Sequence, residues 1–342
     1  MDISERLIDL GIFAFRQKNA RGTFKPHLSI GFRSNEGRLH TFSIDTTRIP
    51  EKYTQPDAYL ITHAHGDHHG KSAMLSNRSF CSDKTALALE TRYGKQFRGI
   101  SVEVGDTAYI GDVPVKTYPT EHTVGSTAFY WENDVGTRIL VTGDVKDPTH
   151  LPECDVLITE ANYGDPADLK CHFDDDLEGF KNTFENCDCI AFGAYAFGKA
   201  QRTVELLRNI GYNGAIEMEK KTLNLTRLLL DNPGELSDIG GYKDGCVCVV
   251  PPHNLGDLPE YISKYTVTGR MNKSQEYPSI QISDHLDAFG LVSMVKTINP
   301  EFTIVYHPKG NRPLKFADYL NSMGFESISI DDINNVLSNE FI

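Results

Sequence analysis

The chain has 342 residues, enough for about two domains or for one large domain that carries an insertion. Hydrophobic residues make up 39% of it and charged residues 24%, values that exclude a disordered or a fibrous protein. The net charge of −13 argues against a surface that holds nucleic acid by general attraction, because Lys and Arg supply most non-specific affinity for phosphates. A local site stays possible, since bound cations add positive charge that this sum ignores.

The sequence shows no targeting or membrane signal. Acidic residues stand in the N-terminal segment MDISERLIDLGIFAFRQKN where a secretory signal would be basic, and charges interrupt its apolar residues. No run of about 18 apolar residues is present that could span a bilayer. We therefore expect a soluble, cytoplasmic protein without a membrane partner, and the oligomeric state stays open.

From His40 to Asn162 the pattern predicts short strands separated by Gly, Pro and Asp turns. Residues 83–93, DKTALALETRY, have a good helix start and helical spacing, which predicts a helix between or over the sheets. The strands are expected at residues 40–45, 58–65, 107–111, 113–120, 126–132, 137–144 and 155–162.

Beyond Asp165 the pattern changes to alternating strands and helices, which predicts βα units around a parallel sheet. A last block returns to single strands that are each followed by a helix. The expected strands are CIAFGAYAF, GAIEME, GCVCVVPP, YTVTGR, SIQISDH and FTIVYHPKG, and the expected helices are GKAQRTVELLRNIG, LNLTRLLLDN, LDAFGLVSMVKTIN and PLKFADYLNSMGF.

Seven cysteines are too few and too scattered for a disulfide framework, and the odd number leaves at least one thiol free. Cys187 with Cys189, and Cys246 with Cys248, have C-x-C spacing in apolar surroundings. Buried strands explain both pairs better than zinc binding does, because structural zinc sites usually have wider spacing.

Residues 62–70, THAHGDHHG, directly follow the apolar run AYLI. His63, His65, Asp67 and His68 are therefore expected in a tight turn at the end of a strand. Imidazole and carboxylate groups are zinc ligands, and alternate residues of an extended segment point the same way. Four ligands in six residues are more than one ion needs, and the alternative is a histidine-rich surface loop. His69 is interpreted as a surface or supporting residue.

Three further residues follow predicted buried strands, whose ends open onto one face of a sheet. They are Asp45 after FSI, His122 after VKTYPT and Asp144 in LVTGD. Each alone could equally be a structural residue.

THAHGDHHG, TEHTVGS and VTGDVKD resemble, in order and spacing, the successive motifs of the metallo-β-lactamase superfamily. The resemblance implies an α/β fold, the αββα metallo-β-lactamase sandwich, that holds two zinc ions, with manganese as a possible replacement. It implies that His63, His65 and His122 hold one ion. Asp67 and His68 would hold the second ion, with Asp144 bridging the two.

From about Ile44 to Gly310 the chain resembles the β-CASP branch, which includes RNA-processing and DNA-repair nucleases. Glu160 in LITEANYGD resembles the first signature acid of that branch, and His285 in ISDHLDAFGL its signature histidine. GAYAFGKAQRTVELL resembles a segment of ligase-associated putative exonucleases. The implied organisation is a core in two parts, residues 1–165 and 273–342, with a smaller α/β β-CASP domain inserted at 166–272. Asp45 would steady the histidine loop.

His307 in IVYHPKG takes the place of the last signature residue, a histidine in RNA-processing members and usually a valine in DNA-repair members. This identity favours RNA, and the resemblance implies that His307 is the last ligand of the second ion. The family more often has Gly directly after this histidine, whereas here Pro308 and Lys309 come before Gly310. A strand-end histidine without a metal is the alternative.

The implied activity is hydrolysis of RNA or single-stranded DNA, by an exonuclease or an endonuclease, with Asp67, His285 and Glu160 as catalytic residues. Two ions can clamp a phosphodiester and acidify a bridging water, so that hydroxide attacks near neutral pH. The departing sugar oxygen still needs a proton, which His285 can supply when a carboxylate such as Glu160 orients it. Glu160 could instead be an ordinary turn acid.

Three more residues are predicted near the substrate: Tyr163, Lys199 and Ser283. Lys199 follows Gly198 at a strand-to-helix junction, with Arg202 farther along, and helix N-termini bind phosphate readily. Helices also simply begin at such positions, which is the alternative for Lys199.

Two other functions stay open. A small-molecule hydrolase of the same superfamily, acting on a thioester, a lactone or a cyclic phosphodiester, would suit the acidic net charge. The inserted segment, long for any loop, argues against it. A scaffold subunit without activity is the third interpretation, but such relatives have lost ligands and this sequence keeps them.

Overall fold

The computed structural model describes residues 3–17, 22–25, 27–47, 55–239, 246–269, 276–307 and 310–335. The chain divides into two compact units. The first unit contains residues 1–121, 125–172 and 285–342, and the second contains residues 122–124 and 173–284. Most of the second unit is therefore one continuous stretch of sequence between two parts of the first.

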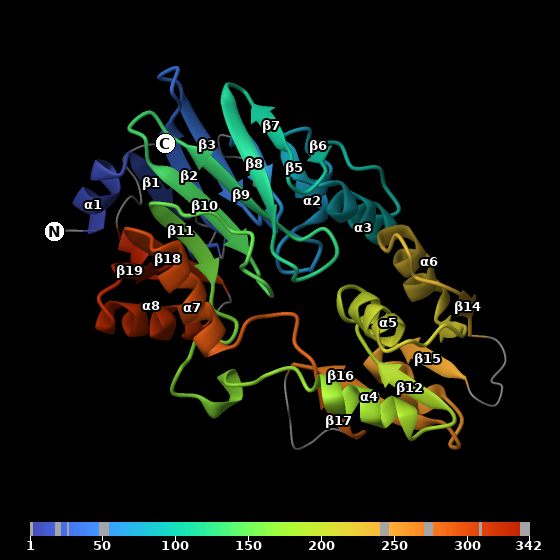
Figure 1. The fold of residues 1–342 in the computed structure, drawn as a ribbon. Coiled ribbons are helices and arrows are strands. Elements are labelled where there is room, and N and C mark those ends of the chain that lie inside the picture. Colours follow the sequence, from blue (N-terminus) through green and yellow to red (C-terminus); the bar gives the residue numbers. More distant parts are fainter. Residues whose placement is uncertain are drawn as a thin grey trace. The chain divides into compact units, whose positions relative to one another are not determined.

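The first unit contains a six-stranded sheet in the order β1-β2-β3-β4-β5-β6 (Figure 1). β1, β2 and β3 pair antiparallel, whereas β3, β4, β5 and β6 pair parallel. The strands are β1 (Ile12–Phe15), β2 (Ser29–Arg33), β3 (Leu39–Ile44), β4 (Ala58–Leu60), β5 (Ser79–Ser82) and β6 (Ile100–Val102).

A seven-stranded sheet of the same unit has the order β19-β18-β11-β10-β9-β8-β7. β19, β18, β11 and β10 pair parallel, and β10, β9, β8 and β7 pair antiparallel. The strands are β7 (Thr107–Ile110), β8 (Val113–Pro119), β9 (Thr127–Glu132), β10 (Arg138–Gly143), β11 (Val156–Glu160), β18 (Phe302–His307) and β19 (Ser327–Ser329).

Alternating side chains of β10 and β11 fill two different cores. Ile139 and Ile158 join a core that also contains Phe32 and Phe42 of the six-stranded sheet. Their neighbour Leu140 faces the opposite side, into a core that contains Leu157, Leu291 and Phe316 among others. Because successive strand residues point to opposite faces, the seven-stranded sheet has one face against the other sheet and one against helices.

Those helices are α7 (Ala288–Ile298) and α8 (Arg312–Ser322), which lie beside β18 and β19 (Figure 1). At the six-stranded sheet, α3 (Asp83–Tyr93) lies next to β5 and β6, and α2 (Lys71–Met74) precedes it. The Ser82 hydroxyl accepts from the Thr85 N–H at the start of α3, and Gly94 ends the helix in the left-handed conformation. The predicted helix at 83–93 is thus confirmed. Shorter elements are α1 (Ile3–Asp9), η1 (Leu169–Cys171) and η3 (Asp332–Asn335).

The second unit has a parallel sheet in the order β14-β13-β15-β12-β16-β17. The predicted βα units around a parallel sheet are therefore confirmed. Its strands are β12 (Ile190–Gly193), β13 (Ile216–Met218), β14 (Leu236–Asp238), β15 (Val247–Val250), β16 (Ser263–Thr268) and β17 (Ser279–Gln281). Its helices are α4 (Leu177–Glu185), α5 (Lys199–Asn209), α6 (Lys220–Leu229) and η2 (Pro252–Asp257).

The two C-x-C pairs lie at the strands of this second sheet. Cys248 is buried inside β15, and Cys189 and Cys246, which directly precede β12 and β15, are 8% exposed each and joined by a disulfide bond. Cys187 is half-buried and lies three residues before β12. Of these four cysteines, Cys248 alone lies inside a strand, and the other three lie just before one.

Within the described ranges, none of the helices combines the length and the apolar character that a membrane crossing requires.

Candidate metal centre

The candidate ligands follow the carboxyl ends of parallel strands in both sheets of the first unit. β3 and β4 are parallel neighbours, and so are β10, β11 and β18, so each set of strand ends meets at one edge of its sheet. At these ends stand Asp45 after β3, the histidine loop after β4, Asp144 after β10, Glu160 at the end of β11 and His307 at the end of β18.

The histidine loop begins earlier than its sequence suggests, because β4 ends at Leu60 and residues 61–70 turn away. His63 and His68 are buried, whereas the Asp67 side chain is 67% exposed. The His68 N–H donates to the His65 carbonyl over 3.1 Å, which closes the turn. His63 Nε2 then lies 3.1 Å from His65 Nδ1, and the two rings stand nearly at right angles, with an interplanar angle of 88°.

The Asp45 carboxylate ties the loop to its surroundings. Its oxygens accept from the Thr62 N–H at 2.9 Å, from His68 Nδ1 at 2.8 Å and from the Tyr306 hydroxyl at 2.7 Å. Asp45 itself has φ 48°, a left-handed conformation that Asp tolerates better than most residues. Since His68 donates from Nδ1, its Nε2 carries the lone pair that a metal ion can use.

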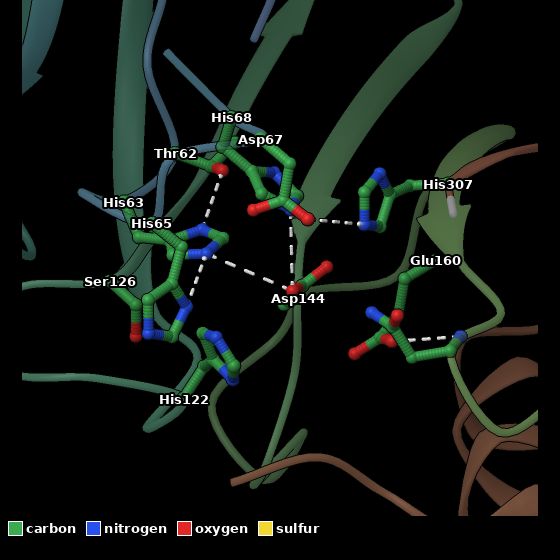
Figure 2. Close-up of polar contacts among 12 residues, drawn as sticks. Thr62, His63, His65, Asp67, His68, His122, Ser126, Asp144, Glu160 and His307 are labelled. Carbon is green, nitrogen blue, oxygen red and sulfur yellow. Dashed lines mark hydrogen bonds and ion pairs between the residues drawn. The ribbon is translucent and has the colours of Figure 1, made fainter. Parts of the chain in front are cut away.

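Gly143 lets strand β10 approach the histidine loop. Its φ is 64°, and a Cβ atom there would lie 2.5 Å from Cβ of Thr62. The next residue, Asp144, is 3% exposed, and its Oδ2 lies 3.4 Å from His68 Nε2 and 3.7 Å from His63 Nε2. Figure 2 shows the Asp144 carboxylate between the His63 and His68 rings and His307.

Electrostatics match this grouping. Burial acts to raise the pKa of Asp144, but attraction by His68 and other imidazoles outweighs it and holds the pKa well below its usual range. Burial also acts to lower the pKa of His68, yet Asp144 and Asp45 raise it well above its ordinary value. The pocket therefore favours positive charge next to Asp144.

Two groups in the first unit have ligand atoms that all lie within 4.8 Å of one another: His63, His68 and Asp144, and Asp67, His68 and His307. Either group could hold a divalent metal ion. His68 Nε2 is buried and has no hydrogen-bond partner among the described residues, which fits a nitrogen that binds a metal. Imidazole with carboxylate is also a donor set that zinc accepts.

His307 closes the second of these groups. Its Nε2 lies 3.6 Å from Asp67 Oδ2, and its ring centroid is 4.2 Å from that of His68. Burial and the nearby His68 lower the pKa of His307, which favours the neutral form that binds metals. Pro308 and Lys309, which separate His307 from Gly310, lie outside the described residues.

His122 belongs to the short segment 122–124 that is counted with the second unit, where its Nδ1 donates to the Asp284 carbonyl over 2.7 Å. The residues on either side of this segment belong to the first unit. Thr120 Oγ1 donates to Ser126 Oγ over 2.9 Å, and the Thr127 N–H donates to the Thr62 carbonyl over 3.0 Å. The loop that carries His122 therefore returns beside the residue that precedes His63.

His285 and Glu160 form a hydrogen-bonded pair. Glu160 is fully buried, and its two oxygens accept from the backbone N–H groups of Val145 at 2.7 Å and Asn162 at 3.1 Å. His285 Nδ1 lies 3.1 Å from Glu160 Oε1 and 3.8 Å from Asp144 Oδ2. The pair holds the ring with Nδ1 toward the carboxylates, so Nε2 is the nitrogen that can exchange a proton with another group.

The three residues predicted near the substrate are all buried. Tyr163 is 5% exposed and lies between Arg312, whose Cζ is 5.7 Å from the ring, and His285, whose ring is 5.8 Å away. In the second unit, the Ser283 N–H donates to Asp175 over 2.7 Å, and Lys199 Nζ lies 2.7 Å from Asp284 Oδ2. Their contact with a substrate stays a prediction.

Sequence reasoning missed four residues that shape the site: Thr62, Gly143, Tyr306 and Asn162. Tyr306 carried a usable signal, because its hydroxyl directly precedes His307 at the end of the strand FTIVYH. The role of Gly143 depends on a close approach to Thr62, which no local pattern reveals.

No family model matches this chain. An RNase J-like protein of Methanocaldococcus jannaschii is 27% identical over 206 residues, which are 51% of this chain and 49% of that protein. A probable DNA ligase of Opitutus terrae is 23% identical over 304 residues, or 80% of this chain and 29% of the ligase. The chain thus spans about half the length of the first relative and less than a third of the second.

Among solved structures, a protein of unknown function from Enterococcus faecalis has a similar fold, with a TM-score of 0.61 and 11% identity over 93% of this chain and 97% of that one. These likenesses support a relationship of the chain to the metallo-β-lactamase superfamily and its β-CASP nuclease branch.

Proposed function

We propose that the protein is a two-zinc phosphodiesterase that cuts RNA or single-stranded DNA, with RNA favoured by the identity of His307. The observation that carries the proposal is the grouping of His63, His68, Asp144, Asp67 and His307 beside the His285–Glu160 pair. The relatives whose names mention RNase J and DNA ligase support a polynucleotide substrate.

The proposed architecture is an αββα metallo-β-lactamase sandwich, for which the two sheets with a shared core in the first unit are the support. The inserted β-CASP domain, predicted at residues 166–272, would correspond to the parallel sheet and helices of the second unit. The core on either side of it would be formed by residues 1–165 and 273–342.

The proposed ligand sets follow from the side chains that face one another. His63, His65 and His122 would hold one ion; the short distance between His63 Nε2 and His65 Nδ1 and the return of the His122 loop beside Thr62 support this set. Asp67, His68 and His307 would hold the other ion, with Asp144 between the two. Zinc suits these ligands, and manganese is the alternative.

When bound, two such ions would polarise a phosphodiester and lower the pKa of water near them. The chain's own contribution is to deliver a proton to the departing sugar oxygen. Glu160 holds His285 by Nδ1, so that Nε2 can carry that proton, and the buried carboxylate stabilises the protonated ring. Asp45 keeps His68 oriented throughout.

The first test separates metal binding from proton transfer. His285→Ala is expected to keep the metal content of the parent. Its turnover rate is expected to fall by about 100-fold or more, because a general acid typically accelerates a reaction by at least that factor. His150→Ala, which removes an exposed histidine of the same unit, is the matched control. Metal content by mass spectrometry and product formation from end-labelled RNA are measured together. Equal cleavage by His285→Ala and the parent would contradict the assignment of the acid.

The second test concerns the substrate. Purified protein is incubated with end-labelled single-stranded RNA and DNA, with and without a chelator, and product lengths are read. Chelator-sensitive cleavage of either polynucleotide is expected. Hydrolysis of a generic small phosphodiester without cleavage of any polynucleotide would instead support the small-molecule hydrolase, and metal content near zero would support the scaffold interpretation.

A further inference from the structure

A buried ion pair in the second unit lies next to a proposed metal ligand. Lys199 is the first residue of α5, and its Nζ lies 2.7 Å from Asp284 Oδ2. The side chains are 11% and 5% exposed. The Lys199 ammonium group is thus enclosed and paired within the second unit.

The same aspartate touches His122 through its backbone. His122 Nδ1 donates to the Asp284 carbonyl oxygen over 2.7 Å, and the His122 side chain is buried. A histidine that donates from Nδ1 to a carbonyl is held in one tautomer and one ring orientation, so that Nε2 is the nitrogen with the lone pair. The position of the Asp284 carbonyl therefore decides where His122 Nε2 points.

A second anchor holds the residue before Asp284. The Asp175 carboxylate accepts from the Ser283 N–H at 2.7 Å and from Arg202 Nη2 at 2.5 Å. Arg202 Nε also lies 3.9 Å from Asp284 Oδ1. Lys199 and Arg202, both on the first turn of α5, thus hold the segment 283–284 from the same helix.

We propose that Lys199 is a positioning residue for His122, which acts by fixing the Asp284 side chain and with it the carbonyl that orients the imidazole. This inference rests on the proposed function, because it takes His122 to be a metal ligand. Stability alone explains the pair poorly, because a buried ion pair is often no more stabilising than apolar residues of the same volume.

Zinc affinity, measured by competition with a chromophoric chelator, tests the proposal. Lys199→Met keeps the length of the side chain and removes its charge. It is expected to lower the affinity for one of the two zinc ions by about 10- to 100-fold, the usual effect of losing a group that supports a metal ligand. The other ion is expected to bind as in the parent. Lys199→Arg, which keeps the charge, is expected to retain most of the affinity. Lys221→Met, at an exposed position of α6, is the matched control and is expected to change nothing.

Lys199→Met leaves Asp284 buried without its partner, so folding is checked by circular dichroism. The double variant Lys199→Met, Asp284→Asn removes both charges and avoids an unpaired buried charge, while the Asp284 carbonyl remains in the chain. It is expected to show the same loss of zinc affinity in a folded protein.

A double-mutant cycle separates positioning from a general structural role. In a His122→Ala protein, adding Lys199→Met is expected to have no further effect on zinc affinity, because the group that it positions is gone. Folded variants that bind both ions as tightly as the parent, or equal effects of Lys199→Met with and without His122, would overturn the inference. A parent protein that binds no zinc would overturn the proposed function itself, so the two failures are distinguishable.

Discussion

At the scale of single residues, Asp45 joins distant segments of the centre, although it belongs to neither candidate ligand group of the first unit. It receives hydrogen bonds from Thr62 and His68 of the histidine loop and from Tyr306 of β18. Because the bond to His68 selects which nitrogen faces Asp144, a change at Asp45 acts on the metal through His68.

Asp45→Asn is expected to lower the affinity for the ion at His68 by about 10-fold or more, because an amide replaces the charged acceptor of His68 Nδ1. Asn tolerates the left-handed φ of this position, so the fold is expected to persist. Isothermal titration with zinc measures the effect, and Asp134→Asn at an exposed position is the control. Unchanged affinity in Asp45→Asn would show that His68 is oriented without Asp45.

At the scale of elements, strand β10 contacts a different part of the first unit at each end. Its carboxyl end comes close to the histidine loop through Gly143, and its amino end is tied to the start of β11 by Arg138 and Asp155. The strand is thus held between the metal centre and an ion pair at the far end of the sheet, which explains how Asp144 keeps a defined position.

Gly143→Ala is expected to impair zinc binding and to destabilise the fold, because the new methyl group would overlap Thr62 and force Asp144 away from the loop. Gly136→Ala provides the control, since Gly136 has a similar positive φ of 83° but nothing within 4 Å of a Cβ atom there. In the control, the free energy of unfolding should fall by only about 1–2 kcal/mol, because alanine disfavours the left-handed conformation. Zinc titration and thermal unfolding compare the two variants, and equal losses would show that the close approach is unimportant.

Arg138→Met tests the other end of β10. The hydrogen bonds from Arg138 lower the pKa of Asp155, so this carboxylate contributes stability above its unfolded pKa, and the contribution is lost as pH falls through the lower folded pKa. The variant is expected to be less stable by about 1 kcal/mol at neutral pH, given the partial exposure of the pair, and equal to the parent in strong acid. Urea unfolding at several pH values measures this, with Lys95→Met as the control. A difference that persists at low pH would contradict it.

At the scale of the whole molecule, the net charge of −13 limits how a polynucleotide can bind. A chain this acidic repels most of a nucleic acid, so binding must depend on a few phosphates at the metal centre rather than on a broad basic surface.

Single-stranded RNA is therefore expected to bind the zinc-loaded His285→Ala protein with a shallow salt dependence. If about three phosphates are engaged, the slope of log affinity against log salt is about −2. Fluorescence anisotropy across a series of salt concentrations measures it. A slope of about −5 or steeper would reveal an extended basic surface that the net charge conceals.

The sequence predicted those parts of the fold and of the centre that are local. The histidine loop lies within nine residues, and the helix at 83–93 has its cap and its spacing in one segment. Alternation of strands and helices likewise predicted the parallel sheet of the second unit, since each βα unit is read from neighbouring residues.

Contacts between distant segments could not be predicted in this way. Tyr306 and Asp45 are 261 residues apart, and the partner of Lys199 is Asp284. Neither contact can be inferred from the residues next to either partner in the sequence. The short strands β1, β2, β5, β6, β14 and β19 were also not anticipated, because each contains only three to five residues and depends on pairing with its neighbours.

The wide spacing of the candidate ligands has a consequence for biosynthesis. During synthesis His63 precedes His307, which ends β18, by more than two hundred residues. In a nascent chain the group of Asp67, His68 and His307 is therefore incomplete until β18 has paired with β11. Under the proposed function, metal capture at this group follows the closing of the seven-stranded sheet, and the captured ion would hold distant segments of the polypeptide together.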